Sequence, residues 1–159
     1  MMTENQNRML IHDLIAAYGD VLDAGEFKQW PAQFADTCFY AVYDAADSER
    51  GLAIAYMLDD CRARVIDRVK FITEVWAGTV EAYRTRHVAQ VTRMTNAGEG
   101  LFAVRSNFMV SYTQPDSTCG MLAAGRAEDL IQINQGEARF VERKLYLDGT
   151  PARYLVYPL

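Results

Sequence analysis

The chain has 159 residues, of which half are apolar and 23% are charged. This size fits one compact domain with one core, so a single domain over residues 1–159 is expected. Lys and Arg number 16 against 21 Asp and Glu, and the net charge of -5 argues against a nucleic-acid partner. No signal-peptide pattern is visible, and no apolar run approaches the roughly 20 residues that span a bilayer. We therefore expect a cytoplasmic protein without a membrane partner.

The N-terminal part of the chain predicts two helical segments and a strand. Thr3 and Gln6 have the spacing of a capping box, and apolar residues then recur at helical intervals until Gly25. Glu26 to Phe34 is expected to form a short second helical segment. Cys38 to Tyr43 follows as a strand, because it is rich in aromatic and β-branched residues.

A third helix is expected after a polar loop over Asp44 to Ser48 and an extended, apolar stretch over Gly51 to Met57 whose assignment is open. The apolar side chains of this helix recur every three or four residues: Leu58, Cys61, Val65, Val69, Ile72 and Trp76. Asp60 and Arg64 are spaced for an i,i+4 ion pair, and Gly78 ends the helix.

From Arg86 onward the hydrophobic period changes to two, which predicts successive strands. One face of the longest strand carries Phe102, Val104, Phe108, Val110 and Tyr112. Turn residues at 96–100, 115–117 and 135–137 indicate a four-stranded meander. The element order favours an α+β fold, a cone-shaped half barrel whose curved antiparallel sheet is packed by about three N-terminal helices. Its concave side is either filled by side chains or holds a pocket.

The residues that bind redox metals are scarce in this sequence. His12 and His87 are the two histidines, and a mononuclear iron site with two histidines and one carboxylate would use both. The cysteines Cys38, Cys61 and Cys119 are widely spaced and form no Cys-x-x-Cys pair. We therefore expect no metal site in this chain, and three buried free thiols.

His87 closes a segment that also contains Arg84 and Arg86, and it is the candidate for acid-base chemistry. A histidine can act as a general base near neutral pH, particularly if Asp20 or Asp23 from the first helix reaches it. The alternative is a structural histidine or a contact with a neighbouring chain. The two arginines are either solvated charges or interface residues, because arginine is over-represented in protein interfaces.

Two groups of motifs point to known families. The first group comprises Tyr18, Asp20 and Leu22, then Trp30-Pro31 and Phe34, then Phe39-Tyr40-Ala41-Val42. It resembles the nuclear transport factor 2-like superfamily, which has a cystatin-like fold. The second group comprises Glu49-Arg50-Gly51-Leu52, Asp67-Arg68-Val69, Tyr83 with Arg84-Thr85-Arg86-His87, and Tyr157-Pro158-Leu159. It resembles the small, or beta, subunit of bacterial aromatic-ring-hydroxylating dioxygenases, of which salicylate 5-hydroxylase and terephthalate dioxygenase small subunits are the nearest types.

The second resemblance implies a division of labour between subunits. In that family three small subunits form a base under three large (alpha) subunits, which hold a Rieske iron–sulfur cluster and a mononuclear iron. This chain would then be a non-catalytic small subunit without a cofactor, forming a trimer that scaffolds the hexamer in aromatic compound catabolism. By the same resemblance, Arg84, Arg86 and His87 would contact a large subunit or a neighbouring small one.

A stand-alone enzyme of the same fold remains open as an alternative. It would be a cofactor-free dehydratase, isomerase or cyclase that uses Asp23 or Asp20, His87 and Tyr40 for proton transfer. A simple binding module is a third reading. The sequence identifies neither the aromatic substrate nor whether one or two hydroxyl groups are inserted.

Overall fold

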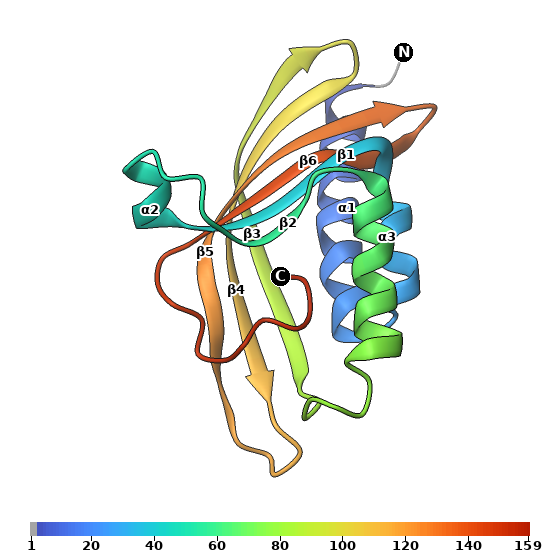
Figure 1. The fold of residues 1–159 in the computed structure, drawn as a ribbon. Coiled ribbons are helices and arrows are strands. Elements are labelled where there is room, and N and C mark those ends of the chain that lie inside the picture. Colours follow the sequence, from blue (N-terminus) through green and yellow to red (C-terminus); the bar gives the residue numbers. More distant parts are fainter. Residues whose placement is uncertain (1–2) are drawn as a thin grey trace.

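The computed structural model describes residues 3–159. Its elements are α1 (Glu4–Asp23), η1 (Phe27–Gln33), β1 (Phe34–Asp44), α2 (Ala45–Glu49), β2 (Ala55–Asp59), α3 (Arg62–Lys70), η2 (Phe71–Val75), β3 (Arg84–Gly98), β4 (Leu101–Thr113), β5 (Cys119–Asn134) and β6 (Glu137–Leu147). The segment η1 is a 3₁₀ helix and η2 is a π-helical turn. Within residues 3–159, no helix is long and apolar enough to cross a membrane. The α+β class is confirmed (Figure 1).

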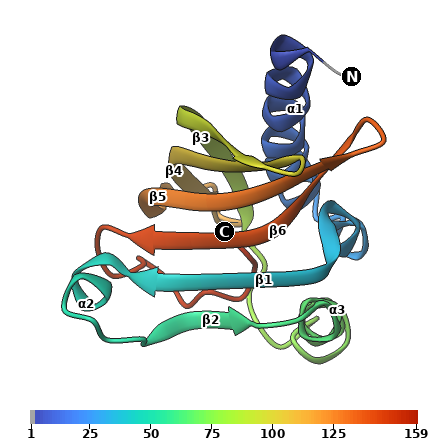
Figure 2. The same ribbon diagram turned by 90° about the horizontal axis from the view of Figure 1, so that it is seen from above.

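The six strands of the described chain form one sheet in the order β2-β1-β6-β5-β4-β3. The four C-terminal strands pair antiparallel in sequence order, which confirms the predicted meander. The strands β1 and β6 pair in parallel, so the expected antiparallel sheet is wrong at that pair. A parallel pair needs a long connection, and here the connection contains α3 and four other strands. Figure 2 shows the sheet curved, with α1 near the β3 edge and α3 near the β2 edge.

The third helix is shorter than predicted. It begins at Arg62 rather than Leu58, because Leu58 belongs to β2 and pairs with Ala41 of β1. The helix then ends in the π turn η2 instead of continuing as a regular α-helix. The predicted ion pair between Asp60 and Arg64 is present, with 3.4 Å between the carboxylate and the guanidinium.

The predicted polar loop over Asp44 to Ser48 is wrong, because it contains the short helix α2. The carboxylate of Asp44 caps this helix by accepting hydrogen bonds from two backbone amides of its first turn. The capping box of Thr3 and Gln6 at the start of α1 is confirmed. The elements η1 and β1 occupy the second helical segment and the first strand that the sequence predicts.

The core lies between the concave face of the sheet and the helices. The inward residues of β4 are buried as the alternation predicts, while the residues between them are exposed. Five fully buried aromatic side chains meet at the centre: Tyr18, Trp30, Phe34, Tyr40 and Phe140. Their rings contact one another mostly edge to face, an arrangement that aromatic pairs prefer.

The segment after β6, residues 148–159, folds back toward the inside of the cone (Figure 1). The hydroxyl of Tyr18 donates a hydrogen bond of 2.6 Å to a backbone oxygen of Leu159. The amide of Leu159 donates a hydrogen bond of 3.0 Å to the hydroxyl of Tyr40. Both tyrosine hydroxyls are therefore satisfied inside the core.

Gly125 on β5 provides a test of the sheet packing. A Cβ at this position would overlap the carbonyl oxygen of Tyr146 on β6, and this backbone atom cannot move without disturbing the strand pair. We expect Gly125→Ala to lower the free energy of unfolding by about 3 kcal/mol. Gly149→Ala is the matched control, because nothing lies within 4 Å of its added Cβ. Urea denaturation measures the stability of both variants. Equal stability of the two would contradict the close contact between Gly125 and the backbone of β6.

Candidate functional site

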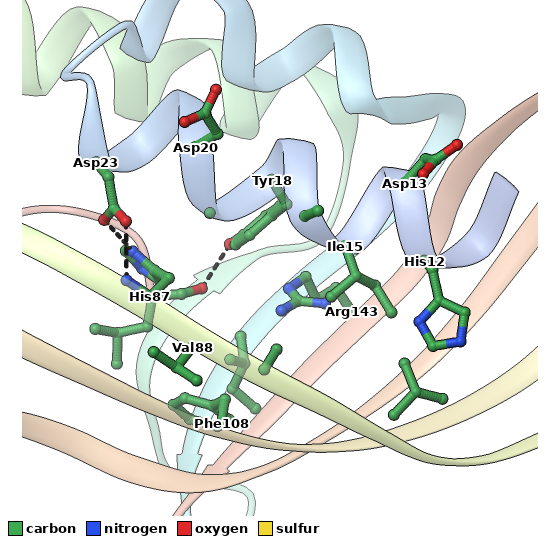
Figure 3. Close-up of a pocket in the computed structure, with 16 residues that line it drawn as sticks. His12, Asp13, Ile15, Tyr18, Asp20, Asp23, His87, Val88, Phe108 and Arg143 are labelled. Atoms are coloured by element: carbon green, nitrogen blue, oxygen red, sulfur yellow. Dashed lines mark hydrogen bonds and ion pairs between the residues drawn. The ribbon is translucent and has the colours of Figure 1, made fainter. Parts of the chain in front are cut away.

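A cavity of about 580 Å³ lies between α1 and the concave face of the sheet. Its volume falls within the range of about 300–1,000 Å³ that is usual for small-molecule sites. Figure 3 shows α1 on one side of the cavity and the strands on the other. The polar residues that line it are His12, Asp13, Tyr18, Asp20, Asp23, His87 and Arg143. The cone therefore keeps a pocket under α1.

The close approach of α1 to β3 depends on Gly19. A Cβ at this position would lie 3.0 Å from the Cβ of His87, which is closer than side chains normally pack. Glycine in a helix interior is less favourable than alanine by about 1 kcal/mol, so its place in α1 has a packing reason. The contact sets the last turn of α1 against the start of β3.

Asp23, at the end of α1, receives three hydrogen bonds from β3. The hydroxyl of Thr85 donates to Oδ1 at 2.9 Å, and the backbone amide of His87 donates to Oδ2 at 2.9 Å. The ring nitrogen Nδ1 of His87 lies 2.6 Å from Oδ1 (Figure 3). Because β3 is an edge strand, an outward backbone amide has no neighbouring strand to bind, and the carboxylate takes that place.

These contacts fix the charge of Asp23 and the orientation of His87. Burial raises the pKa of Asp23, but the hydrogen bonds from His87 and Thr85 outweigh it, so the pKa lies below its ordinary value. An ionised carboxylate can only accept, so Nδ1 of His87 carries a proton. The side chains of Asp23 and His87 are only 10% and 9% exposed. Within residues 3–159, Nε2 of His87 has no hydrogen-bond partner.

The structure brings together His87 and Asp23, but not the other residues considered for proton transfer. Tyr40 is fully buried, its hydroxyl binds Leu159, and it does not line the cavity. Asp20 lines the cavity, yet its carboxylate points away from His87 in Figure 3. A His-Asp pair is therefore present without the tyrosine.

Sequence reasoning missed a buried ion pair at the cavity. Arg143 of β6 and Asp129 of β5 are direct cross-strand partners, and Nη1 of Arg143 donates to the Asp129 carboxylate at 2.7 Å. The guanidinium also lies over the Tyr18 ring, 4.1 Å from its centre. The sequence does show a charged residue, Arg143, at a position of β6 where an apolar side chain is expected. Its partner could not be predicted, because it depends on the register between β5 and β6.

The buried position of Asp129 changes its titration. Burial raises the pKa of Asp129 to about 6, and the guanidinium of Arg143 only partly opposes this. The fold therefore binds this proton more tightly than the unfolded chain does. The resulting stabilisation is complete below about pH 4 and is lost as the pH rises through about 6.

Arg84 and Arg86 are exposed, whereas His87 faces the cavity. Successive side chains of a strand point to opposite faces, so the two arginines lie on the outer face of β3 and His87 on its concave face. The three residues therefore do not share one surface. Their role in subunit contacts stays a prediction.

The residues of this chain do not fit a Rieske centre, which takes two cysteines and two histidines. Among residues 3–159, no group of three or more His, Cys, Asp or Glu side chains is placed to hold a metal ion. All three cysteines are free, and Cys38 is buried as expected. Cys61 and Cys119 are exposed, which corrects the expectation for these two: one precedes α3 and the other begins β5.

Asp23→Asn tests the contact between α1 and β3. Because the pKa of Asp23 is lowered in the fold, its carboxylate stabilises the protein above the unfolded pKa of about 3.9, and this is lost as the pH falls through the folded pKa. We expect the variant to be less stable by about 2 kcal/mol at neutral pH, with a difference that shrinks below about pH 4. Urea denaturation across this pH range measures it. Asp20→Asn, on the same helix but exposed, is the control, and equal effects of the two would contradict the contact.

The comparisons with known proteins agree on one family. Residues 19–151 match the model of the ring hydroxylating beta subunit. Subunit beta 2 of the terminal oxygenase component of terephthalate 1,2-dioxygenase from a Comamonas species is 26% identical over 144 residues, which cover 91% of this chain and 92% of the relative. A solved beta subunit assigned to an aromatic-ring-hydroxylating dioxygenase from Novosphingobium aromaticivorans is 25% identical, covers 95% of both chains and has a TM-score of 0.85.

The fold extends beyond that family. A protein from Novosphingobium aromaticivorans described as a scytalone dehydratase superposes with a TM-score of 0.71, at 18% identity over 96% of this chain and 93% of its own. At that identity the likeness concerns the fold alone. The family match covers most of the chain, so the protein belongs to the beta subunits of ring-hydroxylating dioxygenases and is a subunit of such a terminal oxygenase.

Proposed function

We propose that this chain is a non-catalytic subunit that stabilises the oxygenase assembly in the cytoplasm. Three copies would support three large subunits, which carry the Rieske cluster and the mononuclear iron. The substrate would be an aromatic acid or a related ring, because the Comamonas relative belongs to a terephthalate 1,2-dioxygenase. The observation that carries the proposal is an apolar surface exposed at both ends of the sheet.

At the β2 end, four aromatic residues form a cluster that we call the aromatic patch: Tyr56, Phe71, Trp76 and Tyr154. The exposed fractions of Tyr56, Phe71 and Tyr154 are 44%, 50% and 72%. The Trp76 ring joins two of them, with ring centres 5.9 Å from Phe71 and 5.8 Å from Tyr154. Exposed aromatic clusters are typical of the centre of subunit interfaces.

At the β3 end, a second group of apolar side chains lies on the outer face of the sheet. We call Val88, Met109 and Met121 the outer-sheet patch; their exposed fractions are 59%, 48% and 50%. Val88 and Met109 are direct cross-strand partners. Arg84 and Arg86 lie on the same face of β3, and arginine beside apolar surface is also typical of interfaces.

The two patches suit a ring of identical subunits. A threefold ring closes through head-to-tail contacts, which join two different surfaces of each copy. The aromatic patch and the outer-sheet patch lie at opposite edges of the sheet, so each copy could contact a neighbour on either side. Surface that remains apolar in such a ring would be available to the large subunit.

The double variant Phe71→Ser, Tyr154→Ser tests this proposal. Both side chains are largely exposed, so the fold should keep its melting temperature, while subunit association should weaken by at least about tenfold. Native mass spectrometry of the chain co-expressed with its large subunit would show three copies of each subunit for the wild type, and free chains for the variant. Met9→Ser, which removes an apolar side chain exposed by 65% on α1, is the control. A fully assembled double variant would contradict the role of the aromatic patch.

A second function, proton transfer by the lone chain, is favoured by the Asp23–His87 contact of 2.6 Å beside the cavity. Kinetics of the lone chain with dehydratable or enolisable aromatic substrates separates the two functions. The assembly function predicts no turnover, and near wild-type turnover per assembled oxygenase in His87→Ala. The second function predicts turnover by the lone chain that falls by about two to four orders of magnitude in this variant.

A further inference from the structure

Two buried polar atoms beside the cavity have no hydrogen-bond partner within residues 3–159. They are Nε2 of His87 and Nε of Arg143, and both residues line the cavity. Their side chains are only 9% and 3% exposed. Nearly all buried polar groups in proteins are hydrogen-bonded, so an unpaired group on the wall of a cavity offers a hydrogen bond to a ligand or a water molecule that enters it.

The remaining walls of the cavity are apolar and suit a ring. Ile15 and Ala16 come from α1, Val91 from β3, Phe108 from β4 and Leu145 from β6. An aromatic ring enclosed by such side chains gains from their burial and from contact with the edge of another ring. The cavity thus combines an apolar body with a few polar groups, which is the usual composition of a small-molecule site.

The charges around the cavity argue against an anion. The guanidinium of Arg143 is already paired with Asp129 at 2.7 Å. Asp23 is ionised, and the exposed carboxylates of Asp13 and Asp20 also line the cavity. A ligand carboxylate would meet this excess of negative charge, whereas a neutral ligand would not.

We propose that this cavity binds a neutral aromatic alcohol or phenol, with its ring between Ile15 and Phe108 and its hydroxyl on His87. A hydroxyl group both donates and accepts, so it complements the free ring nitrogen whether or not that nitrogen carries a proton. The site belongs to the subunit itself and needs no iron.

A ring-hydroxylating enzyme adds hydroxyl groups to its substrate. The product of an aromatic acid keeps its carboxylate, so the cavity would take only the hydroxylated products of rings without an acid group. This last step rests on the function proposed above, whereas binding to the lone chain does not. The two fail separately, because the assembly experiment changes the aromatic patch, and none of its four residues lines the cavity.

Isothermal titration calorimetry of the purified chain tests the proposal with three compounds of similar shape. 2-Naphthol carries a neutral hydroxyl, 2-naphthoate carries a carboxylate, and naphthalene carries neither. We expect one 2-naphthol per chain, bound more tightly than either of the others by at least about tenfold, the effect of one hydrogen bond. Absence of 2-naphthol binding, or tighter binding of 2-naphthoate, would overturn the proposal.

Variants of α1 locate the ligand without touching the polar groups. Ala16 lines the cavity and Ala17 does not, although both are exposed on the same helix. Ala16→Phe should block the cavity and weaken 2-naphthol binding by at least about tenfold, while Ala17→Phe should bind as the wild type does. A further variant, His87→Ala on β3, removes the partner of the hydroxyl and should bind 2-naphthol no better than naphthalene. Equal binding of 2-naphthol by Ala16→Phe and Ala17→Phe would place the ligand elsewhere and refute the site.

Discussion

The carboxylate of Asp23 holds the first helix against the edge of the sheet, and the rest of the concave side depends on this contact. It accepts three hydrogen bonds from Thr85 and His87, two of them from side chains and one from the backbone. Gly19 allows the approach, because a side chain there would meet His87. At the other end of the sheet, a bidentate ion pair between Asp59 and Arg68 joins β2 to α3. A helix is thus attached at each edge of the sheet, α1 at β3 and α3 at β2. The space between α1 and the concave face that side chains do not fill is the cavity.

The alternation of side chains along the strands separates two kinds of surface. Inward positions carry the core, the cavity and the buried pair of Arg143 and Asp129. Outward positions of the central strands carry a network of exposed charges, whereas apolar side chains are exposed toward the two edges of the sheet. Assembly and ligand binding would therefore use different faces of the same strands. An inward substitution tests one function and an outward substitution tests the other, with little overlap between them.

Sequence patterns predicted the parts of the fold in which one face is buried. The alternation from Phe102 to Val110 specified β4, since a half-buried strand repeats every two residues. The same reasoning failed at Leu58, whose spacing fits the apolar stripe of α3 although it lies on β2. The parallel pairing of β1 with β6 and the partner of Arg143 depend on register, which no local pattern contains. The sequence offered Asp20 or Asp23 as the partner of His87, and the structure places Asp23 at the ring. The choice depends on how α1 lies against β3, which no local pattern contains.

Amide hydrogen exchange at His87 tests the contact between α1 and β3 most directly. In an antiparallel edge strand every second amide points away from the sheet, and those of His87 and Ala89 both do so. Asp23 accepts from the first, while no side chain among residues 3–159 accepts from the second. The His87 amide should therefore exchange slowly and the Ala89 amide quickly, and Asp23→Ala, which removes both acceptor oxygens, should make them alike. Equally fast exchange at both positions in the wild type would mean that α1 is not held by Asp23.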